Sequence, residues 1–232
     1  MGRRNGISLP ILEQRLGKNF IKEAEEFFGT GYDFNRKIEE IYKALENSVN
    51  FSQEQENLFE DDLSLFSKVL EFHLRVVGSG LEYFDWLGRL YETLGNLNTN
   101  TGQFFTPVTV ADMMAEMTMR KSLKELKQRI EKREAFTIAD PCCGSGRFFL
   151  SLAKTIKKEL GEKALNYVVF FGTDLDSTAF QITLINMILF NLNAVVIHGD
   201  SLTDKVFKRY HVLRGVLPVN LGYFMEIKKG EN

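Results

Sequence analysis

The sequence contains few of the residues that define disulfide-rich or membrane proteins. Its 232 residues include two cysteines, Cys142 and Cys143, which are adjacent and cannot by themselves form a disulfide framework or a zinc site. No apolar run is long enough to span a bilayer, and no apolar segment follows the basic N-terminus as a signal peptide requires. These absences favour a protein of the reducing cytoplasm that has no membrane partner.

Proline, histidine and net charge are also scarce. The four prolines are never adjacent, and the three histidines lack metal-ligand spacing, so no metal site is expected. The formal net charge of −2 does not by itself indicate a nucleic-acid-binding protein. Residues 120–134, however, hold seven bases against three acids. This stretch is either a solvated helix face or a helix that faces phosphate groups.

The pattern of apolar residues divides the chain into two parts. The first 95 or so residues show helical periodicity without a convincing strand, and the Gly78-Ser79-Gly80 break separates two of the helices. A polar loop begins at Asn96. The sequence therefore predicts an N-terminal helical domain over residues 1–97 and a second domain over residues 98–232.

The second part alternates between strand and helix patterns. Thr106-Pro107 predicts a helix start, with the threonine oxygen as the cap, and the helix then carries Val110, Met113, Met114 and Met117. Strands are predicted over 136–140, 167–173 and 194–198, with helices over 146–160 and 177–191. This order predicts an α/β, Rossmann-like domain with a parallel sheet and a ligand site beyond the carboxyl ends of the strands.

A glycine-containing turn follows the first predicted strand. Asp140-Pro141-Cys142-Cys143-Gly144-Ser145-Gly146 leads directly into an apolar-periodic helix. Glycine suits such a turn because a ligand can approach the backbone only where no Cβ intervenes. The Gly-x-Gly-x-x-Gly spacing of dinucleotide enzymes is absent, since Arg147, Phe148 and Phe149 follow the second glycine, and a nicotinamide oxidoreductase is therefore not expected.

Acidic residues end the next two predicted strands. Asp174 is placed to accept the ribose hydroxyls of an adenosine, while Asp176 is predicted to cap the following helix. Asp200 is placed to accept from the adenine amino group, with Ser201 or Leu202 flanking the ring. Helix capping alone is the alternative role for the acids of the second turn.

Four stretches together resemble the modification subunit of type I restriction-modification systems and related adenine-N6 DNA methyltransferases. They are Asp85–Glu92, Thr101–Pro107, Asp140–Gly146, and the pair Gly172–Asp174 with Gly199–Asp200, and they cover roughly residues 80–202. The resemblance implies S-adenosylmethionine as cofactor, with the segment before Pro107 lying over its methionine end. It implies cofactor contacts from Gln103, Phe104, Phe105, Thr106, Pro107, Asp140, Gly144, Ser145, Gly146, Asp174 and Asp200.

Arg147 departs from the family pattern, which often has a small residue at this position. The arginine would either narrow the pocket or place a cation near the cofactor carboxylate.

The catalytic tetrapeptide of the family, Asn/Asp-Pro-Pro-aromatic, is not intact. Asn220-Leu221-Gly222-Tyr223, after an apolar strand-like lead, has the first and fourth residues and neither proline. Asn220 and Tyr223 are hypothesised to be its remnant, and a plain Asn-x-Gly turn is the alternative. A sheet that ends at a fourth strand here has an open edge, which a partner chain or self-association would cover.

The expected function is therefore methylation of adenine N6 in DNA, together with a specificity or other restriction-modification subunit. The alternative is a catalytically inactive cofactor-binding module that acts through a partner chain. Methylation of RNA or of a protein glutamine is a further alternative, because related tetrapeptides also bind planar amides.

Overall fold

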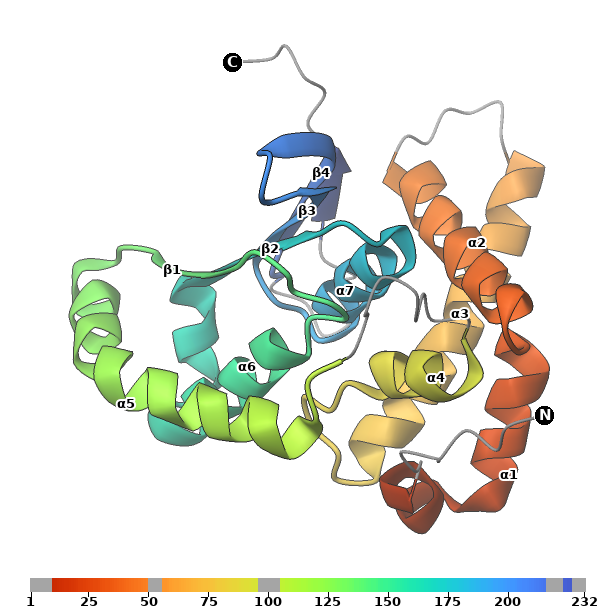
Figure 1. The fold of residues 1–232 in the computed structure, drawn as a ribbon, viewed down its shortest axis with the longest axis horizontal. Coiled ribbons are helices and arrows are strands. Elements are labelled where there is room, and N and C mark those ends of the chain that lie inside the picture. Colours follow the sequence, from red (N-terminus) through yellow and green to blue (C-terminus); the bar gives the residue numbers. More distant parts are fainter. Residues whose placement is uncertain (1–9, 50–55, 96–104, 216–222, 227–232) are drawn as a thin grey trace. The chain divides into compact units, whose positions relative to one another are not determined.

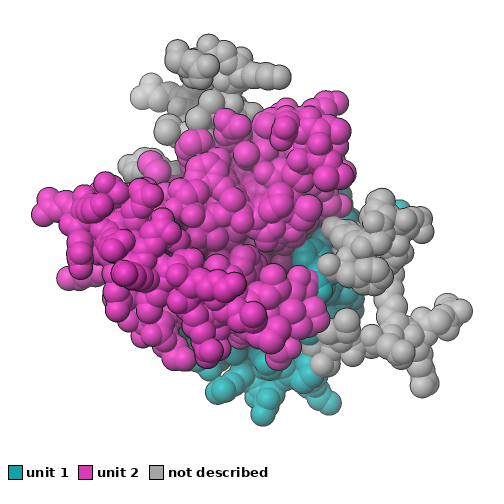
Figure 2. Space-filling model, turned by 60° about the vertical axis from the view of Figure 1, so that its left-hand side comes forward, with its two compact units in different colours: residues 1–105 teal, residues 106–232 magenta. Residues whose placement is uncertain are grey.

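The computed structural model describes residues 10–49, 56–95, 105–215 and 223–226. The chain forms two compact units, residues 1–105 and residues 106–232, which are coloured separately in Figure 2. None of the described helices is both long and apolar enough to cross a bilayer.

The first unit is helical over its described residues, as the apolar periodicity predicts (Figure 1). The first helix is kinked at Gly17, whose φ of 80° lies outside the helical region. The predicted break at Gly78-Ser79-Gly80 is confirmed, because one helix ends at Gly78 and the next begins at Trp86. The helices are α1 (Pro10–Phe28), α2 (Tyr32–Val49), α3 (Glu56–Gly78) and α4 (Trp86–Leu94).

Aromatic side chains from three helices form the centre of this unit. The ring of Phe72 lies 5.4 Å from that of Phe20, 5.9 Å from that of Phe28 and 6.3 Å from that of Trp86. All four side chains are buried. Because each large ring removes much apolar area from water, this cluster is the main source of stability that we identify in the unit.

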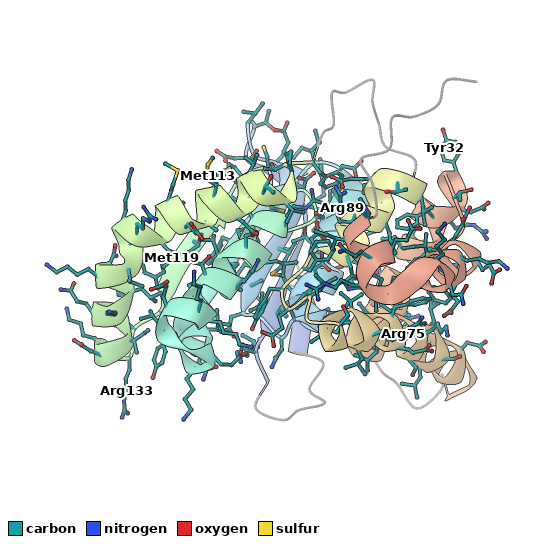
Figure 3. All side chains as sticks on the ribbon, turned by 90° about the horizontal axis from the view of Figure 1, so that it is seen from below. Tyr32, Arg75, Arg89, Met113, Met119 and Arg133 are labelled. Atoms are coloured by element: carbon teal, nitrogen blue, oxygen red, sulfur yellow. The ribbon has the colours of Figure 1, made fainter. Side chains whose placement is uncertain are left out.

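The second unit begins with a helix whose start differs from the prediction by one residue. Pro107, not Thr106, occupies the cap position, and its carbonyl accepts hydrogen bonds from Val110 and Ala111. The prediction of a threonine cap is therefore wrong: α5 has no side-chain cap at all. It ends at Lys132, and Arg133 (labelled in Figure 3) follows as the C-cap in the left-handed conformation, with φ 58°. The helices are α5 (Val108–Lys132), α6 (Arg147–Leu160), the 3-10 helix η3 (Glu162–Tyr167) and α7 (Ser177–Leu189).

The first half of α5 buries alanines and exposes several larger apolar residues. Ala111, Ala115 and Met119 are at most 2% exposed, whereas Met113 is 54% exposed and points away from α6 (Figure 3). The backbones of α5 and α6 can approach closely where only alanine intervenes. The remaining apolar residues of the predicted stripe are also exposed: Val110, Met114 and Met117.

Three parallel strands match their predicted positions within two residues. The sheet order is β1-β2-β3-β4-β5, and β1 pairs with β2, and β2 with β3, in parallel. Helices connect these strands, as the predicted β-α-β-α-β order requires. The strands are β1 (Phe136–Asp140), β2 (Val168–Asp174), β3 (Ala194–Asp200), β4 (Lys205–Leu213) and β5 (Tyr223–Glu226).

The last two strands correct the expectation of a parallel sheet. β4 runs antiparallel to β3, and β5 antiparallel to β4. Only residues 201–204 separate β3 from β4, which is too short a connection for a parallel crossover. Within the described strands the edges are therefore β1 and β5, and the domain is mixed α/β.

Both helices that follow a strand tip pack on the same face of the sheet. The ring of Phe149 on α6 lies 5.1 Å from that of Phe170, and the ring of Phe180 on α7 lies 5.3 Å from that of His198. The strand register places Phe170 and His198 on one face. The opposite face carries Phe171, which is 38% exposed.

Candidate functional site

The three predicted acids lie at the same end of the sheet. Asp140, Asp174 and Asp200 are the last residues of β1, β2 and β3, which run parallel. Carboxyl ends of parallel strands are where ligands bind in open α/β sheets. The structure thus brings the turns that follow these strands to one edge, and direct contacts join the turns to each other.

The first turn is shaped by glycines that no other residue replaces easily. Gly144 and Gly146 have φ values of 58° and 78°, in the left-handed region. A Cβ on Gly146 would lie 3.2 Å from Met187 and Thr183 of α7. The turn is therefore pressed against α7, and a side chain at Gly146 would displace it.

Asp174 joins the first turn to the second. Its Oδ2 accepts a hydrogen bond from the Gly144 N–H at 2.7 Å, and its Oδ1 accepts one from the Asp176 N–H at 2.9 Å. Burial raises the pKa of this carboxyl above its ordinary value of 3.8, and the two N–H donors oppose that rise. Each oxygen keeps one lone pair for a further donor, such as a sugar hydroxyl.

Asp176 has the capping role predicted for it. Its side chain accepts a hydrogen bond from the Ala179 N–H at 2.8 Å, at the start of α7. The prediction that Asp176 caps this helix is confirmed, and the ribose role of Asp174 stays a prediction.

Two residues of α7 that the sequence analysis missed form hydrogen bonds to the glycine turn. The Thr183 hydroxyl donates to the Gly144 carbonyl at 2.6 Å, and the Asn186 amide donates to the Ser145 carbonyl at 2.9 Å. Both side chains are fully buried on α7. The available signal was a pair of polar residues, three positions apart, in the largely apolar segment 179–189.

The third turn contacts the first. The Cys142 thiol lies 3.9 Å from the Ser201 hydroxyl, and Cys142 also donates its N–H to Asp140 at 3.0 Å. Hydrogen bonds from the Thr203 hydroxyl and the Leu202 N–H lower the pKa of Asp200, which stays ionised at neutral pH. Leu202 is 95% exposed, and the prediction that Ser201 or Leu202 flanks an adenine ring stays a prediction.

A hollow of about 550 Å³ opens at this edge of the sheet. Asp140 and Asp200 line it, together with Thr173, whose carbonyl accepts a hydrogen bond from the Cys143 N–H at 3.0 Å. Gly144 and Asp174 are not part of its lining, because Phe171, Thr173 and Ile197 place the hollow on the face of the sheet opposite α6 and α7. The remaining lining residues are Ala139, Pro141, Phe171, Ile197, Ser201, Asp204, Lys205, Val206 and Arg209.

The upstream segment is described only in part. Gln103 and Phe104 lie outside the described residues, and the Phe105 ring packs edge-on against Tyr91 at 5.7 Å in the first unit. Thr106 and Pro107 are exposed and lie immediately before α5 in the second unit.

Of the two predicted catalytic residues, the structure describes the backbone of Tyr223 alone. Asn220 lies outside the described residues. Tyr223 is the first residue of β5 and pairs with Leu213, next to the pair of Val212 with Ala194, the first residue of β3. Because Asp200 is the last residue of β3, Tyr223 lies at the opposite end of the sheet from the three acids.

The sequence of residues 82–223 matches the N-6 DNA methylase family. The chain belongs to this family. The match covers the acidic turns, the glycine turn and all of α5.

Individual methylase subunits and a methyltransferase are similar to the chain over part of their length. It is 24% identical to the type I restriction enzyme MpnII methylase subunit of Mycoplasma pneumoniae over 82% of this chain and 32% of that protein. It is 30% identical to the MjaIX methylase subunit of Methanocaldococcus jannaschii over 57% of this chain and 20% of that protein. It is 27% identical to the type II methyltransferase M.MamI of Microbacterium ammoniaphilum over 72% of this chain and 45% of that protein.

The chain therefore spans less than half the length of these relatives. No solved structure matches it at a significant level.

Proposed function

We propose that the chain is the cofactor-binding part of an S-adenosylmethionine-dependent adenine-N6 DNA methyltransferase of the type I modification kind. The observation that carries the proposal is the contact between strand-end turns. Gly144 is bonded to Asp174, and Cys142 lies against Ser201, so the glycine turn and both acidic turns form one continuous surface.

The residues present fit the proposed cofactor. The hollow of about 550 Å³ is lined by Asp140 and Asp200 but not by Gly144 or Asp174, so the fit rests on the hydrogen-bonding groups of the turns. Carboxylates only accept hydrogen bonds at neutral pH, and an adenosine offers hydroxyl and amino donors. Asp174 would hold the ribose, Asp200 the adenine amino group, and residues 103–107 would cover the methionine end. When bound, S-adenosylmethionine supplies an activated methyl group.

The chain's own contribution to the reaction is orientation. The glycine turn is fixed by Thr183 and Asn186 of α7, and Asp174 fixes it to β2. Such a rigid frame lowers the cost of aligning a cofactor with a second reactant. DNA is the proposed second reactant, and the basic half of α5 is available for its phosphates.

A second candidate is a catalytically inactive cofactor-binding module that acts through a partner chain. Two observations favour it: no two prolines are adjacent in the sequence, and Tyr223 lies at the far end of the sheet. Both candidates share the cofactor site and differ only in whether this chain positions the target base. In either case a specificity subunit or another restriction-modification subunit is the expected partner.

Cofactor binding is tested by thermal unfolding with and without ligand. A ligand at 100 times its Kd stabilises the folded state by about 2.7 kcal/mol. For a chain of this size we expect a rise in Tm of about 5–10 °C with S-adenosylmethionine and none with NAD⁺. The absence of a rise at millimolar S-adenosylmethionine would contradict the proposal.

Catalysis is tested separately with methyl-labelled S-adenosylmethionine. DNA, RNA and a protein extract, each free of prior methylation, are offered as acceptors in parallel. Label in DNA adenine that is lost in Asn220→Ala would support an active methyltransferase. Cofactor binding without transfer to any acceptor would support the inactive module, and transfer to RNA or protein would replace DNA as the substrate.

A further inference from the structure

Arg147 is the first residue of α6, immediately after the glycine turn. Its side chain is only 4% exposed. A cation at a helix N-terminus opposes the helix dipole, and burying it carries a further cost. An apolar residue would fill the same space without these penalties, so packing alone does not account for an arginine here.

The guanidinium of Arg147 contacts a backbone group of the segment before α5. Its Nη1 donates a hydrogen bond to the Thr106 carbonyl at 2.6 Å. That carbonyl precedes Pro107, which has no N–H and therefore cannot help to fix the segment as a donor. The first helical hydrogen bonds of α5 go to the Pro107 carbonyl instead. Thr106 thus lies outside the helix, and the arginine links it to the glycine turn.

The packing of α5 on α6 has a separate polar link. One turn along α6 from Arg147, the Ser151 hydroxyl donates to Asp112 Oδ1 at 2.7 Å, and Lys154 forms an ion pair with Asp112 at 3.2 Å. This link joins the bodies of the two helices. The Arg147 link instead joins α6 to the backbone just before α5, at Thr106.

From these contacts we infer that Arg147 is a positioning residue for the cofactor site: it fixes the Thr106-Pro107 segment beside the glycine turn. The inference rests on the proposed function, in which residues 103–107 cover the methionine end of the cofactor. This role requires neither of the two effects expected from the sequence, a narrowed pocket or a cation near the cofactor carboxylate. Its role is to fix the conformation of the Thr106-Pro107 segment, which the methionine part of the cofactor would contact.

The role predicts selective loss of affinity for one part of the ligand. Arg147→Gln removes the link and should weaken S-adenosylmethionine binding about tenfold or more, because the segment is no longer ordered before binding. Adenosine lacks the methionine part, and its affinity should stay within about twofold. Arg147→Lys, with a single donor group and no planar fork, should fall between Arg147→Gln and the wild type.

Titration calorimetry of the full chain with S-adenosylmethionine and with adenosine measures both affinities. Ser151→Ala is the matched control, because it removes the other buried link between the same helices and should leave both affinities unchanged. Adenosine binding by each variant also shows that its site is folded. Hydrogen exchange of the peptide over residues 105–111 should be faster in Arg147→Gln than in the wild type.

The outcomes separate this inference from the function on which it rests. If wild-type protein binds neither ligand, the proposed function and the role of Arg147 both fail. If wild-type protein binds both and Arg147→Gln loses both equally, or loses neither, only the positioning role is overturned. Equal losses in Arg147→Gln and Ser151→Ala would likewise reduce the arginine to a structural contact.

Discussion

The two units of the chain bury different kinds of side chain. In the first unit the interior is aromatic, with Phe20, Phe28, Phe72 and Trp86 in mutual contact. Of the nine buried polar or charged residues among those described, seven belong to the second unit and two, His73 and Asp85, to the first. Folding of the second unit therefore removes more polar side chains from water, at a larger desolvation cost, than folding of the first.

Four of the seven buried polar residues of the second unit lie in the glycine turn or beside it: Ser145, Arg147, Thr183 and Asn186. Thr183 and Asn186 hold its carbonyls, Arg147 extends from its end, and Asp174 receives its N–H group. Buried polar groups that converge on one loop indicate a site, whereas a continuous apolar interior indicates stability alone. The comparison thus separates a unit with an apolar interior from a unit whose buried polar groups support the proposed cofactor site.

The largest expected effect is on the stability of the first unit. Phe72→Ala removes the ring that contacts three others and should lower the free energy of unfolding by about 3–5 kcal/mol. Affinity for S-adenosylmethionine should not change, which calorimetry checks at a temperature where the variant is folded. A loss of affinity would mean that the two units are energetically coupled.

A comparable effect, on binding rather than folding, is expected at Asp174. Asp174→Ala removes the acceptor of two N–H groups and the proposed ribose contact, and should lower cofactor affinity about 100-fold or more. The rise in Tm with S-adenosylmethionine should disappear. The matched control is Asp176→Ala, which loses the α7 cap at about 1 kcal/mol of stability but should keep the rise in Tm.

A smaller effect is expected at Thr183. Thr183→Val keeps the shape of the side chain and leaves the Gly144 carbonyl without its 2.6 Å donor. The free energy of unfolding should fall by about 1–2 kcal/mol, and cofactor affinity should fall by a few-fold because the turn is less rigid. Chemical denaturation and calorimetry measure the two effects. A stability loss without any change in affinity would show that the turn does not need this support to bind.

The smallest effect near neutral pH concerns the protonation of Asp174. Because burial raises the pKa of this carboxyl in the folded protein, the folded state takes up the proton before an unfolded chain does as the pH falls. Protonation of this carboxyl therefore raises the free energy of unfolding as the pH falls. Binding behaves oppositely, since the proposed ribose contact needs the carboxylate.

Cofactor affinity should accordingly begin to fall at a higher pH than an ordinary aspartate would produce. Titrations between neutral and mildly acidic pH check this for the wild type, and Asp174→Asn should remove that dependence. An unchanged pH profile in Asp174→Asn would assign the dependence to another group.

Local sequence patterns determined the elements that carry the acidic turns. Strands, helices and the Asp176 cap depend on residues close together in the chain, so periodicity and capping chemistry predict them. The same patterns missed β4 and β5, although each pairs antiparallel with the strand that precedes it in the chain, because such pairing depends on cross-strand partners and not on the preference of one segment. Tyr223 lies at the opposite end of the sheet from the acidic turns, and the role hypothesised for it stays a prediction.

The sequence by itself therefore determined which residues stand at the strand ends, and with them the family resemblance. Only the tertiary structure decided which of those residues touch. The contacts of Arg147 with Thr106 and of Thr183 with Gly144 join residues 41 and 39 positions apart. Such contacts arise from how helices pack on the sheet, and no spacing within a single segment encodes that packing.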